Sequence, residues 1–361
     1  MAETTITVST PTEAAAAQQF SRETWHEAKR NNFWGKFMGA GSENIIQVKD
    51  DLSKSKGDVV NWSLVVKLSS AGIAGDGWVE GNEESMSTYE ESVLLGKLSH
   101  GVRLGGKLTE QRPSWNLRDE AKSELARWFA DQLTEWIFKK LTGTSYQGYA
   151  GTSAGTKGSL TSIGEGATAN TNIVYGGDAI SAATLDESDT FSPDLLKIAK
   201  IQAKTGVFSG TTQYKMRPVI IDGIETYIAV LHPWQIYDLK EHATYNEAML
   251  HARERAQSNP IFTGAVGIWD GVAVFEHDQV PTVATGGAGG DVDYANALFL
   301  GAQAGCLVTA QESPDWVEKT FNYGQKFGIM TGMMMGFDKA VFNSIDFSVI
   351  VLRTAAKDPT A

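Results

Sequence analysis

Two short motifs have the spacing of loops that carry enzyme chemistry. GTSAG, at 151–155, has the G-x-S-x-G spacing that presents a nucleophilic serine, here Ser153, between a strand and a helix. Its neighbours are Gly, Ser and Thr with no apolar strand before them, so a chance match is the better interpretation. GVRLGGKL, at 101–108, lacks the Ser or Thr of a phosphate loop. A hydrolase that uses Ser153 is therefore a remote alternative.

The other candidates for catalysis or metal binding lack a convergent pattern. None of the histidines has a ligand spacing such as H-E-x-x-H: His26, His100, His232, His242, His251 and His277. The adjacent pairs Glu83–Glu84 and Glu90–Glu91 would face opposite sides of a strand. At His232, just before a proline, we expect a structural hydrogen bond. The sequence predicts no catalytic, cofactor-binding or metal-binding residue, and no enzyme.

The composition is that of a globular, acidic chain. It has 361 residues and a formal net charge of -12, which disfavours sequence-specific binding of nucleic acid. Its one cysteine, Cys306, excludes an internal disulfide and lies in an apolar run that predicts burial. The start of the chain lacks the pattern of a signal peptide, and no apolar run is long enough for a membrane span. We expect folding in a reducing, cytoplasm-like compartment.

A long helix is the clearest predicted element. Apolar residues recur at helical spacing over 114–142, with Ser114 as the N-cap and Gly143 as the stop. Shorter helices are expected at 193–205 and 233–255. Strands are expected on both sides of two Asp-Gly turns, over 295–309 and in the C-terminal region. Strands and helices do not alternate, so the predicted class is α+β with mostly antiparallel strands.

The stretch from Asp58 to Leu108 predicts an extended hairpin. Two β-rich runs flank a loop of glycine and acidic residues, and arms of up to about 20 residues could project about 50 Å. An isolated hairpin is marginal in water, so it is either part of a larger sheet or an arm that lies on a neighbouring subunit. Aromatic residues near the N-terminus also need a partner, on this chain or on another. The candidate contacts between subunits are Trp25, Phe33, Trp34, Trp78, Glu80, Glu83 and Glu84.

Four runs in the same order resemble a known family. They are NPIFTGAVGIWDGVAVFEHDQVP (259–281), HPWQIYDL (232–239), GFDKAVFNSIDFSVIVLRTAA (336–356) and KGDVVNWSLVVKL (56–68). Together they span most of the chain, and 143–190 matches least. The sequence resembles the major capsid proteins of tailed phages, in particular the coliphage N-four type.

The resemblance implies the Hong Kong 97-type capsid fold. That fold has an N-terminal arm, an extended loop, a peripheral domain with a long spine helix, and an axial domain. The implied ranges are 1–54 for the arm, 55–112 for the extended β-hairpin loop, 113–189 for the peripheral domain with spine helix 114–142, 190–310 for the axial domain, and 311–361 for the return to the peripheral domain. The hairpin would then be long because it lies across a neighbour.

The resemblance also implies a function and partners. Copies of the chain would form hexamers and pentamers and close an icosahedral shell around double-stranded DNA, without sequence-specific binding. The implied partners are the chain itself, a separate scaffold protein, a portal protein and a decoration protein, with no membrane and no cofactor. The implied location is the virion, after assembly in the host cytoplasm. An encapsulin-type nanocompartment shell is the alternative with the same fold.

Overall fold

The structure is a computed structural model. It describes residues 23, 27–28, 31–50, 57, 59–65, 72–75, 77–83, 88–106, 111, 117–143, 170–208, 211–212, 215–221, 223–252, 265–284, 286–311 and 314–359. The GTSAG motif with Ser153, and the candidate contacts Trp25 and Glu84, lie outside these ranges.

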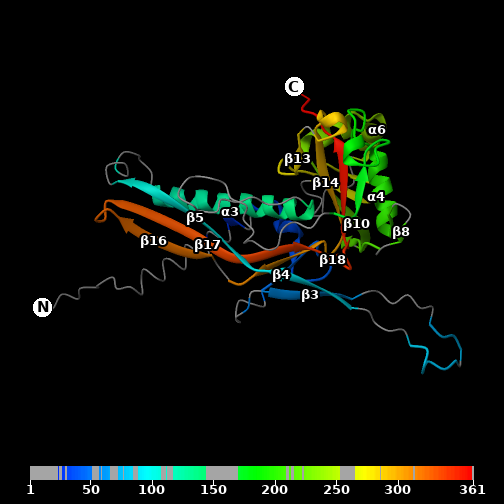
Figure 1. The fold of residues 1–361 in the computed structure, drawn as a ribbon, viewed down its shortest axis with the longest axis horizontal. Helices are drawn as coiled ribbons and strands as arrows, with labels where there is room; N and C mark the ends of the chain where they lie inside the picture. Colours follow the sequence, from blue (N-terminus) through cyan, green and yellow to red (C-terminus); the bar gives the residue numbers. More distant parts are fainter. Residues whose placement is uncertain are drawn as a thin grey trace.

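The first of two large sheets forms an elongated body together with one long helix (Figure 1). Its strands are β1 (Met38–Gly39), β2 (Ile46–Lys49), β5 (Gly96–Gly106), β15 (Gly305–Thr309), β16 (Asp315–Phe321) and β17 (Lys326–Lys339). β17 is its longest strand and pairs with β5, β15 and β16. A run of methionines lies in β17, where Met333 and Met335 are fully buried.

The long helix is confirmed as α3 (Leu117–Leu141). It lies along the first sheet, because one face repeats large apolar side chains at helical spacing. Leu125, Phe129 and Trp136 are each 1% exposed on that face. From Phe129 onward, this face shares a core cluster with the methionines of β17. Burial of several large side chains, each worth roughly 1.5–3 kcal/mol, fixes the helix on the sheet.

The second sheet forms the body at one end of α3 (Figure 1), and one core cluster joins it to α3 and the first sheet. Its strands are β6 (Ile173–Tyr175), β9 (Val219–Ile221), β10 (Ile224–Leu231), β11 (Gly267–Trp269), β12 (Val272–Glu276), β13 (Thr282–Val283), β14 (Tyr294–Leu300) and β20 (Val349–Ala355). The strands predicted around the two Asp-Gly turns are confirmed as the antiparallel pairs β9–β10 and β11–β12.

Helices flank the second sheet. They are α4 (Pro193–Thr205), α5 (Pro233–Glu241) and α6 (Ala243–Ala252), with 3-10 turns η3 (Ala182–Thr184) and η4 (Ala288–Gly290). α4 begins after Ser192 and ends at Gly206, whose φ is +72°, as expected for a C-terminal glycine. The helix predicted over 233–255 is wrong as a single element, because the extended backbone at His242 separates α5 from α6.

The strand predicted over 295–309 is two strands in different sheets. β14 pairs in the second sheet and β15 in the first, so residues 301–304 carry the chain from one body to the other. Gly301 permits the close approach at this crossing, since a Cβ there would lie 2.5 Å from the carbonyl oxygen of Arg217. After this crossing the chain returns once more to the second sheet, where β20 pairs with β14 and β6.

Part of the hairpin predicted from Asp58 to Leu108 lies within the described residues. There β3 (Val59–Val65) pairs with β4 (Thr88–Leu94), while β5 continues the chain into the first sheet. Trp62 is 2% exposed and packs with Phe342 and Val308 of its own chain. The base of the hairpin is thus covered by its own subunit. The remaining described pairs are β18 (Val341–Phe342) with β19 (Ile345–Asp346), and β7 (Val207–Phe208) with β8 (Thr211–Thr212).

His277 makes the stability of this core depend on pH. Burial lowers the pKa of the imidazole below its usual value, and the carboxylates of Asp278 and Asp131 oppose this shift. As pH falls through about 6.5, the unfolded chain takes up the proton before the folded chain does. The free energy of unfolding is therefore highest above this range and falls below it. In His277→Gln, urea unfolding should show a smaller loss between pH 7.5 and pH 5 than in the wild type.

A matched control is His100→Gln, at an exposed histidine stacked on Trp128. It should keep the pH dependence of the wild type. An unchanged pH dependence in His277→Gln would contradict the prediction.

Candidate assembly surfaces

The N-terminal aromatic segment packs inside its own chain. Trp34 is 0% exposed, and its ring centroid lies 4.8 Å from that of Phe138 on α3. Phe33, on the same turn η1 (Phe33–Phe37), is partly buried and lies 4.6 Å from the His277 ring. Trp34, one of the candidate contacts between subunits, has no free surface on its side chain in the single subunit. Phe33 is likewise packed against the core of its own subunit and is partly buried there.

Residues 72–83, unlike the N-terminal aromatic segment, carry large apolar side chains that are exposed. In Figure 1 this segment lies far from both sheets, beyond the end of the β3–β4 hairpin. Trp78 is 79% exposed and Val79 is 62% exposed, and Ile73 is exposed as well. Large apolar side chains that no part of their own subunit covers are typical of a surface that another molecule covers.

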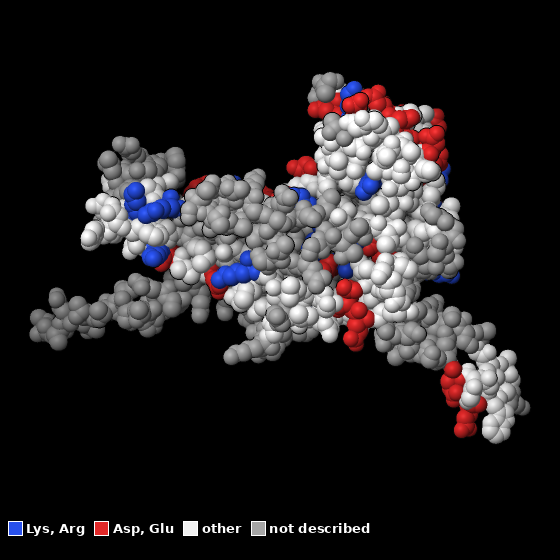
Figure 2. Space-filling view, in the orientation of Figure 1, with Lys and Arg blue, Asp and Glu red and all other residues white. Residues whose placement is uncertain are grey.

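Local hydrogen bonds give the tip of this segment a defined turn. The Asn82 N–H donates to the Val79 carbonyl at 3.0 Å, and Gly81 has a φ of +88°. A positive φ at the third position of a four-residue turn is typical of type II and favours glycine. The Glu83 carboxylate accepts the Gly81 N–H at 2.7 Å. The turn thus presents Trp78 and Val79 beside Glu80 and Glu83. Acidic side chains are visible at this end of the molecule in Figure 2.

A second apolar surface lies at the edge of the second sheet. Exposed isoleucines occupy the outer face of α4 and the strands β9 and β10: Ile198, Ile201, Ile220 and Ile224. Two ion pairs hold α4 beside the strands, between Lys200 and Asp270 at 2.8 Å and between Lys204 and Glu225 at 3.2 Å. The sequence prediction did not single out this surface. The sequence contained a sign of this apolar surface, because Ile201 falls on the polar face of the predicted helix.

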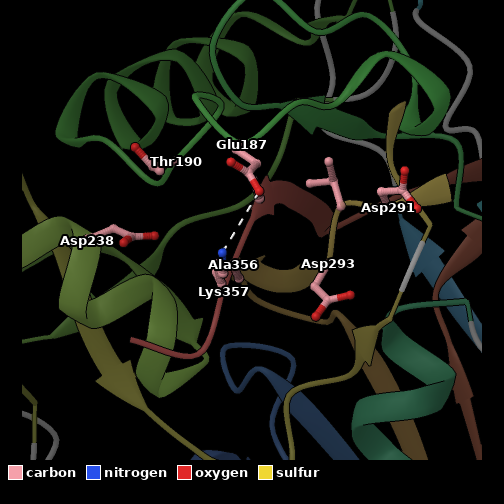
Figure 3. Close-up of a pocket in the computed structure, with 9 residues that line it drawn as sticks. Glu187, Thr190, Asp238, Asp291, Asp293, Ala356 and Lys357 are labelled. Carbon is pink, nitrogen blue, oxygen red and sulfur yellow. Dashed lines mark ion pairs between the residues drawn. The ribbon is translucent and has the colours of Figure 1, made fainter. Parts of the chain in front are cut away.

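An acidic pocket of about 240 Å³ opens at the far end of the second sheet (Figure 3). Its lining combines the loop before α4, helix α5, the loop before β14 and the residues after β20. The labelled residues are Glu187, Thr190, Asp238, Asp291, Asp293, Ala356 and Lys357. Burial raises the pKa of Asp238 to about 6. Asp and Glu also gather over this end of the molecule in Figure 2.

The pocket lacks the arrangement of an active site. Its described lining consists of carboxylates, one threonine, one lysine and apolar residues, with no histidine or cysteine to act as base or nucleophile. Nearby, Asp178, Asp186 and Asp189 have oxygen atoms within 4.8 Å of one another. The Asp189 carboxylate accepts hydrogen bonds from the backbone N–H groups of Asp186 and Asp178. These bonds explain why the carboxylate lies at the centre of this loop.

The described motifs that were considered for enzyme chemistry have structural roles. The described part of GVRLGGKL, residues 101–106, continues β5 and pairs with β17 rather than forming a phosphate loop. The His232 ring accepts the Trp234 N–H at 3.3 Å and caps α5, as expected for a structural hydrogen bond. Cys306 is fully buried. Among the described helices, none combines the length and apolar character needed to cross a membrane.

Comparisons with known proteins agree with this architecture. The phage capsid protein family model matches residues 9–358. The major capsid protein of Pseudomonas phage KPP25 is 30% identical over 372 residues, which cover 93% of this chain and 94% of that protein. The capsid of Ralstonia phage GP4 superposes with a TM-score of 0.80 at 29% identity, over 91% of this chain and 92% of that one.

A more distant structure shows the same fold. The capsid protein of cyanophage Pam1 has a TM-score of 0.69 at 22% identity, over 91% of this chain and 93% of that one. The chain belongs to the phage capsid protein family. Its fold is the Hong Kong 97 type, and its role is that of a tailed-phage major capsid protein. The encapsulin-type alternative is not favoured, since the matches are to phage capsids.

Proposed function

We propose that copies of this chain assemble as hexamers and pentamers and close an icosahedral shell around double-stranded DNA. The exposed pair Trp78 and Val79 is the observation that carries this proposal, because this apolar surface lies apart from the core of its own subunit. A neighbouring subunit is the partner that the proposal assigns to it. Glu80 and Glu83, beside the pair, would contact basic side chains of that neighbour.

The proposal assigns a role to each part of the fold. The first sheet and α3 form the peripheral domain, with α3 as the spine helix. The second sheet forms the axial domain around the centre of each capsomer, and its exposed isoleucines would meet the next axial domain. Residues around 72–83 serve as the tip of the extended loop. In this assignment the axial domain includes β6, which precedes its expected start, and β20, which follows its expected end.

The proposed partners and location follow from shell assembly. A separate scaffold protein would set the size of the shell, a portal protein would occupy one vertex, and a decoration protein could bind outside. The shell encloses DNA without reading its sequence, as expected for a chain with a net charge of -12. We place the protein in the virion after assembly in the host cytoplasm, with a structural rather than an enzymatic role.

Electron microscopy of the purified protein tests this function. Negative staining, with size-exclusion chromatography and light scattering, should show closed shells or separate hexamers and pentamers. The sample is measured alone and after co-expression with the neighbouring genes, which would supply the scaffold. A stable monomer under both conditions would contradict the proposal.

A further inference from the structure

Lys339 is an unusual residue at the joint between the two sheets. It ends β17, and its side chain is 0% exposed. Its ammonium nitrogen lies 2.7 Å from Oδ1 of Asp346, whose side chain is 1% exposed. Lysine is almost never fully buried unless it is paired, so a specific arrangement must hold it there.

The side-chain amide of Asn170 contacts the same nitrogen. Lys339 Nζ donates a hydrogen bond to Asn170 Oδ1. The Asn170 amide nitrogen donates in turn to the backbone carbonyl of Leu141, at 3.1 Å, which fixes the plane of the amide at the end of α3. Because this amine is hydrogen-bonded to the Asn170 carbonyl oxygen, it lies close to the carbonyl carbon Cγ, the atom that a nucleophile attacks.

Asp346 is held in place by a second set of hydrogen bonds. Its Oδ2 accepts the Thr171 N–H at 2.7 Å, and its own N–H donates to the Thr171 hydroxyl at 2.9 Å. The segment that carries Asn170 is therefore fixed against the turn that carries Asp346. Amine, amide and carboxylate form a group of three whose members come from distant parts of the chain.

We propose that Lys339 and Asn170 form an isopeptide bond within the chain, with Asp346 as the proton carrier. Asp346 takes a proton from the Lys339 ammonium, and the neutral amine attacks Cγ of Asn170. The tetrahedral intermediate then loses the amide nitrogen, which receives the proton from Asp346 and leaves as ammonia. Asp346 takes up the second proton of the former amine nitrogen, so the new amide is neutral. One N–C bond forms and one breaks, with no oxidant, reductant or other co-reactant.

Two physical effects favour this reaction at the joint. Burial lowers the pKa of the Lys339 amine, and the charge of Lys140 acts in the same direction, while the Asp346 and Asp338 carboxylates oppose the shift. Proton transfer between Lys339 and Asp346 also replaces a buried ion pair by two neutral groups, which a low-dielectric interior favours. The fixed positions make the attack effectively unimolecular, and this preorganisation lowers the barrier.

The mass of the wild-type chain tests the proposal directly. Formation of the bond removes one ammonia, so the intact folded protein should weigh about 17 Da less than its sequence requires. Digestion should release a branched peptide that joins the segment with Asn170 to the segment with Lys339, and trypsin should not cleave after Lys339. On a denaturing gel the chain remains a single subunit, because both partners belong to it.

An unmodified mass, with the two segments recovered as separate peptides, would overturn the proposal. A loss of about 18 Da with a branched peptide at Asp346 would also overturn it, since that product is a lysine–aspartate bond formed by loss of water. Neither result depends on whether any variant folds.

Variants test the roles of the three residues. Lys339→Met and Asn170→Ala should abolish the mass loss, and Asp346→Asn should abolish or greatly slow it while both bonding partners remain. Circular dichroism confirms that each variant is folded before its mass is interpreted. Lys200→Met is the matched control: Lys200, on α4, is a paired lysine 2.8 Å from Asp270, and its loss should leave the bond intact. Complete bond formation in a folded Asp346→Asn variant would overturn its assigned role.

Discussion

Replacing both Trp78 and Val79 by alanine should prevent shell assembly at concentrations where the wild type assembles, without destabilising the isolated subunit. Both side chains are exposed in the single chain, so their removal costs little folding free energy. In an assembled shell they would be buried against a neighbour, where truncation of a tryptophan hot spot costs about 2 kcal/mol or more. The concentration needed for assembly should therefore rise by roughly 30-fold or more.

Light scattering over a concentration series, with the scaffold protein present if it is needed, measures this change. Urea unfolding of the unassembled subunit provides the stability for comparison. Ile180→Ala is a matched control, because Ile180 is 84% exposed on a different loop. It should assemble as the wild type does. Normal assembly of the double variant would show that this turn is not a contact between subunits.

Trp34→Ala should have the reverse effect and unfold a large part of the subunit. Trp34 is fully buried among Phe33, Phe37 and Phe138, and removal of a buried tryptophan costs about 3–5 kcal/mol. That is a large fraction of the 5–15 kcal/mol that stabilises a typical protein. Urea unfolding should show a midpoint well below that of the wild type, and assembly should fail because little folded subunit remains.

Trp34→Phe is the conservative control, since it keeps an aromatic ring and most of the buried surface. It should recover a substantial part of the lost stability. If Trp34→Ala unfolds at the same urea concentration as the wild type, the segment at 31–39 does not contribute to the core as the structure indicates.

The contrast between Trp34 and Trp78 shows what could not be predicted from the sequence, namely whether an aromatic side chain is buried in its own subunit. Both were predicted as contacts between subunits because aromatic residues favour interfaces, but the same residues favour cores. Their neighbours carry the distinguishing signal. Trp34 has Phe33 before it and Phe37 one turn later, whereas Trp78 and Val79 lie among glycine and acidic residues, which supply little apolar surface to cover them. Only the tertiary structure shows which partner each one has.

Elements defined by local signals were predicted correctly. Helix α3 has a long apolar periodicity, and the two Asp-Gly turns mark hairpins through the backbone that glycine allows. The change of sheet at Gly301 was missed, because β14 and β15 are both buried throughout and read as one apolar run. Pairing over long sequence separations, such as β20 with β14, leaves no comparable local trace.

Candidate functional residues were predictable only where exposure follows from composition. The turn at 77–83 is rich in glycine and acidic residues, so its position at the surface could be anticipated. The group around Lys339 could not, because Asn170, Lys339 and Asp346 meet only after both sheets have formed. A lysine within the apolar run FDKAVF was a sign of an unusual environment, but it did not identify the partners.

The crossing at 301–304 has a mechanical consequence for the shell. Hydrogen bonds join it to the returning chain, from the Ala340 N–H to the Ala304 carbonyl and from the Gly301 N–H to the Ser348 carbonyl. Two adjacent backbone connections therefore link the sheets, and a load on one is transmitted to the other without a hinge. Under the outward pressure of packed DNA, each subunit would behave as one stiff plate. Differences in curvature between five-fold and six-fold positions would then be taken up by segments outside the plate, such as the turn that carries Trp78.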